Sequence, residues 1–486
     1  HKREGVSTFK EAPMTRSSIR PAILIVLAVL LVVLVILVIG ACFLKDTEHT
    51  KLDHWAHKIG LDLHLEKHSR RARVKAVRHK TGLDARADFQ GLRKHPCDQD
   101  LDQRIYTDPN TGMEFYPYVF SKTLTHNSTT GFALKSDVDD MISAIKDRSA
   151  SSLAQIRQDP ASVRPFVNLM AGSNFSLIGI DAQATRTQVK RPLADSERGM
   201  FELAEVYSKS LLRDVSFWDL ESGANATAQQ HLVYLNGFID KSSAPLDSKQ
   251  SIDAKRLHRG QLPGDLEGPY ISQFLYSSFR NGSLQVDQKF RVEGDVEETT
   301  SFPDWLRMQH GELHLTPAAL SSPGVAYLHS PRGLASIVHT DPLYQFYYNA
   351  TLVCQELGLE PEFGGASPVN SNWISGGFAD ILQAVAGVSV EALKAAWFHK
   401  WNLNLGIRPE VLAQRIDLVQ SQPTSIAPLI LNCPGFATMR TYSEGKLSGL
   451  LSEVKQASLD GSSCLLKLVY PEGSPVHPTF PRLVRT

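Results

Sequence analysis

The apolar positions of this chain form one long continuous run near the N-terminus and helical periodicities over most of the rest. Residues 21–44 carry no charged side chain and consist mainly of Val, Leu and Ile. As a helix, this run would be about 36 Å long, which is enough to cross a bilayer. It is also longer than the apolar region of a cleavable signal peptide. The pattern therefore predicts a transmembrane signal anchor at residues 21–44.

The charges on either side of this run predict its orientation. Residues 1–20 contain five Lys and Arg, whereas residues 45–64 contain three. Because the more basic flank of a membrane helix stays in the cytoplasm, residues 1–20 are predicted to be a cytoplasmic tail. The protein would then be a single-pass membrane protein with a lumenal or extracellular domain. In a rival interpretation, Ile39-Gly-Ala-Cys42 resembles a bacterial lipoprotein cleavage box, although the apolar run is too long for such a signal peptide.

Residues 45–105 are predicted to form a stem or linker. Its basic stretch, Lys67–Lys80, could contact anionic lipid or another polyanion, but its charge pattern favours a solvated linker. Five N-glycosylation sequons follow on the side predicted to be lumenal, and they support a eukaryotic secretory route. Their acceptor residues are Asn127, Asn174, Asn225, Asn281 and Asn349.

Residues 106–486 show mainly helical periodicity and are predicted to form an all-α domain. The polar residues 288–315 include Pro303 and several Thr, which indicates a loop or a small hairpin. Helices are expected at Ser196–Leu212, Thr227–Leu235, Tyr270–Phe279, Leu343–Leu357, Ile374–Val388 and Leu447–Ala457.

A candidate anion site lies at the end of a further predicted helix, which should begin near Ser389, a favourable N-cap residue. Lys400 falls on the apolar stripe of this helix that includes Trp397. Either its stem covers apolar surface while its ammonium reaches water, or the ammonium meets an anion in a cleft. Arg408 precedes a proline, where the helix should already have ended, so its guanidinium can join Lys400. Lysine and arginine together suit a tetrahedral oxyanion.

Composition and cysteine spacing narrow the picture only slightly. Lys and Arg together number 51, as do Asp and Glu, so net charge argues neither for nor against any class of partner. No nucleic-acid partner is expected. The five cysteines fit no zinc-binding spacing. Cys42 lies in the apolar run. The other four either form disulfides in one of three connectivities or remain buried free thiols; they are Cys97, Cys354, Cys433 and Cys464.

Motifs spread from about residue 120 to residue 481 occur together in a recognisable order. Lys400 is followed eight residues later by Arg408-Pro-Glu410. The other motifs are Arg213-Asp-Val-Ser-Phe217, Pro263-Gly-Asp-Leu-Glu-Gly-Pro-Tyr-Ile-Ser-Gln-Phe-Leu275, Leu334-Ala-Ser-Ile-Val-His-Thr-Asp-Pro-Leu-Tyr344 and Pro471-Glu-Gly-Ser-Pro-Val-His-Pro-Thr-Phe-Pro481. The set closely resembles the vanadium-dependent haloperoxidases of the algal and cyanobacterial bromoperoxidase type. Acid and lipid phosphatases of the same superfamily share the anion site, because vanadate has the shape and charge of phosphate.

The resemblance implies two packed four-helix bundles, with vanadate bound in the second. Lys400 would polarise a vanadate-bound peroxide, and Arg408 would clamp the vanadate oxygens. His477 would lie near the site on a loop leading into it, unless it is structural. Trp397 would line the halide entry, unless it only packs in the core. Hydrogen peroxide, a halide and an organic acceptor are the implied reactants, and a homo-oligomer is possible.

One departure from the family pattern concerns the loop after Pro481. The family continues with Ser-Gly-His, whereas this chain has Arg482, Leu483 and Val484. The family's later arginine and its vanadium-liganding histidine have no counterpart, so we expect an incomplete second bundle at the C-terminal end. The expectation is therefore a chain that neither binds vanadate tightly nor oxidises halide. Two alternatives are an acid phosphatase-type hydrolase and a non-enzymatic glycoprotein relative.

Overall fold

The computed structural model describes residues 102, 104–147, 150–156, 158–173, 181–185, 191–238, 251–259, 264–291, 301–312, 324–340, 344–359, 376–421, 432–458, 461–470 and 472–479. All of them belong to the second of two compact units, Leu92–Thr486. The predicted tail, the anchor and nearly all of the stem lie outside the described residues, as do Asn174 and residues 482–484.

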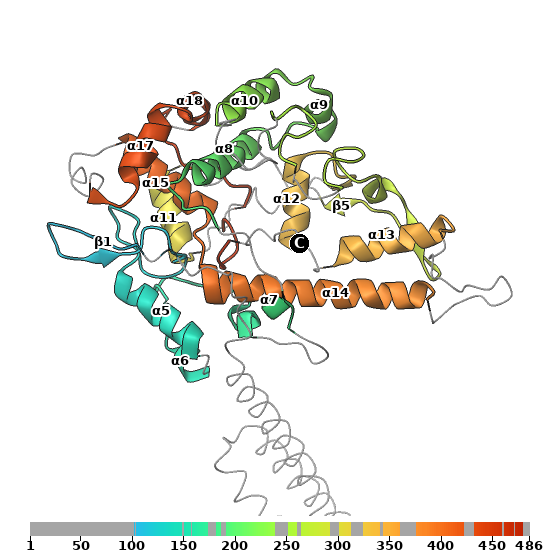
Figure 1. The fold of residues 1–486 in the computed structure, drawn as a ribbon, viewed down its shortest axis with the longest axis horizontal. Helices are drawn as coiled ribbons and strands as arrows, with labels where there is room; N and C mark the ends of the chain where they lie inside the picture. Colours follow the sequence, from blue (N-terminus) through green and yellow to red (C-terminus); the bar gives the residue numbers. More distant parts are fainter. Residues whose placement is uncertain are drawn as a thin grey trace, which may run out of the picture. The chain divides into compact units, whose positions relative to one another are not determined.

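The described region is mainly helical, as the periodicity predicts, with a few short strands (Figure 1). The strands form three antiparallel pairs: β1 (Tyr106–Thr107) with β2 (Glu114–Phe115), β3 (Phe279–Asn281) with β4 (Leu284–Val286), and β5 (Phe290–Arg291) with β6 (Val325–Ala326). The α-helices are α5 (Lys135–Asp147), α6 (Ala150–Ala154), α7 (Ala182–Thr185), α8 (Glu197–Leu211), α9 (Phe217–Ser222), α10 (Ala226–Asn236), α11 (Phe302–His310), α12 (Pro331–Thr340), α13 (Gln345–Glu356), α14 (Phe378–Phe398), α15 (Pro409–Ser421), α17 (Phe436–Glu444) and α18 (Ser448–Ala457). Shorter turns are the 3-10 helices η1 (Leu169–Ser173) and η3 (Gln273–Tyr276), and the π-helix η5 (His399–Asn404).

The largest hydrophobic cluster surrounds α8, which packs against α10, α15, α17 and α18 (Figure 1). Ser196 caps α8 as predicted, because its Oγ accepts the Gly199 N–H at 3.1 Å. Met200, Leu203 and Tyr207 then point into the cluster at helical spacing and are fully buried. The arrangement as two four-helix bundles stays a prediction.

A second hydrophobic cluster lies beneath the end of α14. It joins the segment Val119–Leu124, helix α5 and Val476 to Trp397 and Trp401. The Trp401 ring meets the Phe120 ring edge-on at 5.6 Å between centroids. These contacts hold the end of α14 against segments that are distant from it in sequence.

The helix that carries the candidate anion site is longer than predicted. Ser389 lies inside α14, where its Oγ donates to the Val385 carbonyl at 2.7 Å instead of capping a new helix. Among the described residues, Phe378–Asn404, 27 residues long, is the one helical stretch apolar and long enough to cross a membrane, a test that core helices of soluble proteins also pass.

Two other predicted elements are wrong. Residues 270–279 contain the short turn η3 and the start of β3 instead of a helix, and Gln288 ties that segment down by donating to the Ser277 carbonyl at 2.7 Å. Residues 288–315 contain α11, which the proline-based prediction of a loop missed. Ser301 caps that helix, and Pro303 occupies its first turn, where proline is tolerated.

Cysteine placement favours one of the two interpretations for the residues that the structure describes. Cys354, Cys433 and Cys464 are free thiols, and the last two are buried. Burial raises the pKa of Cys433 and Cys464 to about 12, so both stay protonated at neutral pH.

Candidate oxyanion site

The backbone at the end of α14 is shaped by a wide turn. In η5, the Leu405 N–H donates to the Lys400 carbonyl at 3.1 Å, and Leu405 takes a left-handed φ of 37°. The Phe120 N–H then donates to the Leu405 carbonyl at 2.7 Å. The turn therefore ends the helix, and the segment that follows leads to Arg408.

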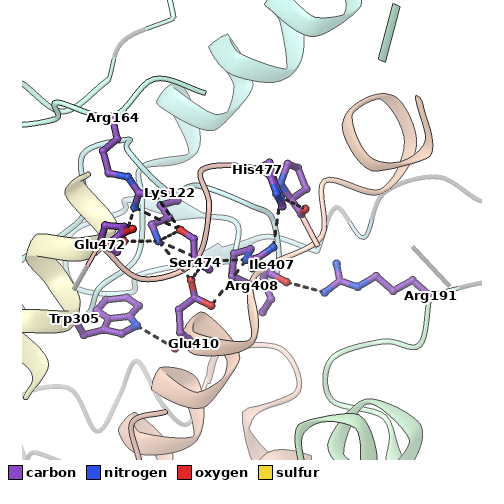
Figure 2. Close-up of polar contacts among 11 residues, drawn as sticks. Lys122, Arg164, Arg191, Trp305, Ile407, Arg408, Glu410, Glu472, Ser474 and His477 are labelled. Carbon is purple, nitrogen blue, oxygen red and sulfur yellow. Dashed lines mark hydrogen bonds and ion pairs between the residues drawn. The ribbon is translucent and has the colours of Figure 1, made fainter. Parts of the chain in front are cut away.

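Gly406 allows three segments to meet at this point. It forms a bridge with Val119, and its carbonyl accepts the Thr479 N–H at 3.0 Å. A Cβ on Gly406 would lie 2.2 Å from Nη1 of Arg191 and 2.5 Å from Oγ1 of Thr479, so a side chain there would displace both. Arg191 also donates from Nη2 to the Ile407 carbonyl at 3.3 Å (Figure 2). The residues that lead into Arg408 are therefore fixed on both sides.

Lys400 is fully buried, so the interpretation in which its ammonium reaches water is wrong. Its Nζ lies 4.0 Å from the centroid of the Trp397 ring, in cation–π geometry. Burial and the nearby charge of Arg408 lower the Lys400 pKa to about 6. An anion bound beside Lys400 would counteract both effects.

Arg408 lies between a serine and a histidine of the 472–479 loop. Its side chain is 15% exposed, and its Nε donates to Ser474 Oγ at 2.9 Å. Its Nη1 lies 3.4 Å from His477 Nδ1 (Figure 2). Burial lowers the Arg408 pKa, although the charge of Glu410 partly offsets this effect.

Glu410, in the first turn of α15, lies on the other side of Ser474. The Ser474 hydroxyl donates to Glu410 Oε1, and Lys122 Nζ lies 3.6 Å from the same oxygen. Burial raises the Glu410 pKa, but the charges of Lys122 and Arg408 outweigh burial and lower it overall. Glu410 is therefore an ionised carboxylate at neutral pH.

Two further cations bind the backbone of the same loop. Lys122 Nζ donates to the Ser474 carbonyl at 2.6 Å, and Arg164 Nη1 donates to the Glu472 carbonyl. The Glu472 side chain instead pairs with His339 Nε2 at 3.2 Å. Burial lowers the Lys122 pKa to about 7, although Glu410 raises it.

His477 completes the group of predicted site residues. It is 7% exposed, and its ring meets the Trp397 ring edge-on at 5.4 Å between centroids. Burial, Lys400 and Arg408 lower the His477 pKa to about 3, so the imidazole is neutral at pH 7. Its Nδ1 lies 2.9 Å from the Pro478 carbonyl, which places the proton on Nδ1 and a lone pair on Nε2.

The structure thus brings Lys400, Arg408, His477 and Trp397 together in one buried place. We call the following residues the site cluster: Lys122, Arg164, Lys400, Arg408, Glu410, Ser474 and His477. It contains four basic side chains and one carboxylate, a balance that fits an oxyanion such as phosphate or vanadate. Sequence analysis gave no role to Lys122 and Arg164. Glu410 and Ser474 lay inside motifs already noticed, which is the signal that could have identified them.

The sequon asparagines within the described residues differ in how they are held. Asn281 is exposed at the β3–β4 hairpin. Asn225 caps α10 and Asn127 closes a turn, each through its own Oδ1. Asn349 Nδ2 lies 3.4 Å from Gln288 Oε1. Asn281 is therefore the most accessible of these four acceptors.

Comparison with known proteins identifies relatives of one kind. No family model matches the chain. It is 26% identical over 454 residues to a vanadium-dependent bromoperoxidase of Corallina pilulifera and 25% identical over 446 residues to that of Corallina officinalis, covering 78% and 77% of this chain and 74% and 73% of theirs. A vanadium-dependent bromoperoxidase of Ascophyllum nodosum is 26% identical over 289 residues, which cover 58% of this chain and half of that one.

Among solved structures, the fold matches the homohexameric second vanadate-dependent bromoperoxidase of Ascophyllum nodosum, with a TM-score of 0.65 and 23% identity. That match covers 83% of this chain and 66% of the other. At this identity, the structural match shows only a shared fold. The relationship to the bromoperoxidases rests on the sequence matches. The chain is a distant relative of the vanadium-dependent haloperoxidases.

Proposed function

We propose that this chain is a haloperoxidase-type protein in which two members of the site cluster, Lys400 and Arg408, bind the oxygens of vanadate. The observation that carries the proposal is the burial of Lys400 near Arg408, whose charge lowers the Lys400 pKa, and near a neutral His477. A buried arginine, and a buried lysine that takes up a proton when an anion lies beside it, are donors suited to an oxyanion. The relatives named above supply its identity as vanadate.

Each residue has a role that follows from its surroundings. Arg408 is oriented by Ser474 through Nε, which leaves its Nη groups to donate toward an oxyanion. Lys400 gains its proton when the anion binds and then donates to an oxygen from over the Trp397 ring. His477 holds a lone pair on Nε2 that can take up a proton. When bound, vanadate supplies Lewis-acid activation of hydrogen peroxide toward a halide.

The test is direct binding followed by two activity assays. The 486-residue chain is titrated with vanadate and followed by vanadium NMR, with Lys400→Met and Arg408→Met as variants. We expect weak binding by the wild type, in keeping with the expectation that this chain does not bind vanadate tightly, and no binding by either variant. A folded wild type that binds neither vanadate nor phosphate would overturn the proposal. Hydrogen peroxide-dependent halogenation of an organic acceptor supports the haloperoxidase, whereas phosphomonoester hydrolysis without it supports the phosphatase alternative.

We further propose that the protein is a single-pass membrane glycoprotein with its helical domain outside the cytoplasm. The proposal rests on the uncharged residues 21–44, the basic residues 1–20 and the sequons. Expression in a eukaryotic secretory host and treatment with glycosidase should lower the apparent mass, with Asn281→Gln removing part of the change. Unchanged mass, together with protease access to the domain only from the cytosol, would reverse the topology.

Light scattering of detergent-solubilised protein reports whether it is a homo-oligomer.

A further inference from the structure

We propose that Lys122 and Arg164 are positioning residues that clamp the 472–479 loop against Arg408 and so set the geometry in which an oxyanion is bound. The proposal rests on the function proposed above for its ligand, but the clamp itself is a property of the loop. Neither cation is assigned to the anion. Their donors point instead at backbone carbonyl oxygens of the loop (Figure 2).

The contacts of the two cations converge on two carbonyls. Lys122 Nζ donates to the Ser474 carbonyl at 2.6 Å and to the Glu472 carbonyl at 3.4 Å. Arg164 donates to the Glu472 carbonyl from Nη1, and its guanidinium also reaches the Ser474 carbonyl at 3.5 Å. Hydrogen bonds from charged donors to carbonyls are stronger than neutral ones. Two cations on the carbonyls of Glu472 and Ser474 therefore fix this part of the backbone.

Ser474, whose carbonyl is clamped, in turn orients Arg408. The single hydroxyl proton of Ser474 goes to Glu410, so the hydroxyl oxygen presents a lone pair to Arg408 Nε at 2.9 Å. Three residues further along the loop, the His477 ring lies beside the guanidinium, with Nδ1 3.4 Å from Arg408 Nη1. A shift of the loop would consequently move the hydroxyl that orients the guanidinium and the ring beside it.

The backbone that carries Lys122 is itself held in a strained conformation. Thr123, the next residue, has a φ of 75°, which is rare for a β-branched side chain. Its N–H donates to the Gln309 carbonyl at 2.6 Å, and its carbonyl accepts the Asp159 N–H at 2.7 Å. Its Oγ1 accepts from Gln158 Nε2 at 2.8 Å. Strain that is kept by several hydrogen bonds next to a buried cation is consistent with a positioning role.

The main rival explanation is that Lys122 only neutralises the buried charge of Glu410. The double variant Lys122→Met/Glu410→Gln separates the two explanations, because it removes both charges while keeping similar shapes. If Lys122 only neutralises Glu410, the double variant regains what Lys122→Met loses. If Lys122 clamps the loop, the double variant stays impaired.

The experiment uses the full chain and two readouts. Hydrogen exchange at Gly473, His477 and Thr479 reports the loop, since their amides donate to backbone carbonyls. Vanadate affinity reports the site. The variants are Lys122→Met, Arg164→Met and the double variant, with Lys135→Met as control, because Lys135 pairs with Asp139 at the surface. Arg164 is only partly buried, so its variant keeps the test decisive if the Lys122 variants fail to fold.

We expect loop exchange to accelerate and vanadate affinity to fall by about tenfold in each clamp variant, roughly the loss of one hydrogen bond to a charged group, with no change in Lys135→Met. Unchanged loop exchange in Arg164→Met, or wild-type behaviour of the double variant, would overturn the clamp. If the wild type binds no oxyanion, the proposed function fails, and loop exchange alone still decides for or against the clamp.

Discussion

Two buried polar clusters of the described region have similar hydrogen-bond lengths but opposite charge balance. The first is the site cluster around Arg408. The second, which we call the Ser208 network, consists of Ser208, His231, His258 and Glu453. Ser208 Oγ lies 3.0 Å from His231 Nδ1 and 2.8 Å from His258 Nε2, and His231 Nε2 lies 2.9 Å from Glu453 Oε2.

The Ser208 network has the order of groups found in a serine, histidine and acid triad. Yet Ser208 and His231 are fully buried, and the Ser208 hydroxyl and both ring nitrogens of His231 have partners inside the network. Burial lowers the His258 pKa well below its usual value, so His258 is neutral and can donate to Ser208. Hydrogen-bond geometry alone thus does not mark a functional site. The excess of buried positive charge distinguishes the site cluster.

The largest expected effect comes from Arg408→Met, which removes a charged donor from the site cluster. Two hydrogen bonds to an anion, at about 1.5–3 kcal/mol each, predict a fall in vanadate affinity of at least about 100-fold. Isothermal titration calorimetry measures it. The matched control is Arg280→Met, because Arg280 pairs with Glu356 on the surface. Equal vanadate affinities of the two variants would show that the site cluster, despite its excess of positive charge, does not bind the anion.

Ser208→Ala should destabilise the protein without affecting anion binding. It leaves two buried histidine nitrogens without the hydroxyl, at a cost of about 1–3 kcal/mol in the free energy of unfolding. Urea unfolding gives the value, with exposed Ser222→Ala as control. A loss of vanadate binding or of any hydrolase activity in Ser208→Ala, at unchanged stability, would make the network functional and remove the contrast.

Lys400→Met, unlike Ser208→Ala, should raise the free energy of unfolding of the ligand-free protein. The folded pKa of about 6 lies below the usual 10.5, so the unfolded chain binds more protons between these values. The lysine therefore destabilises the fold below pH 10.5, increasingly so down to pH 6. Replacing it should raise the free energy of unfolding by about 1–3 kcal/mol at pH 8, while binding is lost. Thermal unfolding at pH 6, 8 and 10 checks both sign and trend, and a loss of stability at pH 6 would contradict it.

The smallest effect concerns pH. In the free protein, Lys400 is charged only below about pH 6, so anion binding above that pH requires proton uptake and weakens as pH rises. Lys400→Arg keeps its charge and should flatten this slope, although not the slope due to the anion's own titration. Affinities measured from pH 6 to 8 for the two proteins give the difference. Parallel slopes would mean that Lys400 is already protonated in the free protein.

Sequence reasoning identified the residues that lie close together along the chain. Lys400 and Arg408 form one local motif, and His477 belongs to another, so their resemblance to a family could be noticed. Lys122 donates to a carbonyl 352 residues away, and no local pattern encodes such a contact. Its strained neighbour Thr123 likewise gives no signal, because a β-branched residue is a poor indicator of a positive φ.

Secondary structure was predictable where the helix signals were strong and local. Ser196 gave the start of α8, because a cap acts through its own turn. Ser389 has the same side chain but failed as a cap, since packing of α14 continues the helix through it and turns its hydroxyl to Val385. The residue type alone could not separate the two cases. The π-helical turn after Phe398 was also not foreseeable from its composition.

That π-helical turn has a consequence for the spacing of the site residues. A π-turn contains one more residue than an α-turn and is equivalent to a one-residue insertion in the helix. Deleting one residue between Lys400 and Leu405 would leave too few residues for this wide turn, so the bond from the Leu405 N–H to the Lys400 carbonyl and the left-handed step at Leu405 would both be disturbed. The eight-residue interval between the two cations thus includes the extra residue of the turn, and shortening it would alter their placement while every side chain of the site was still present.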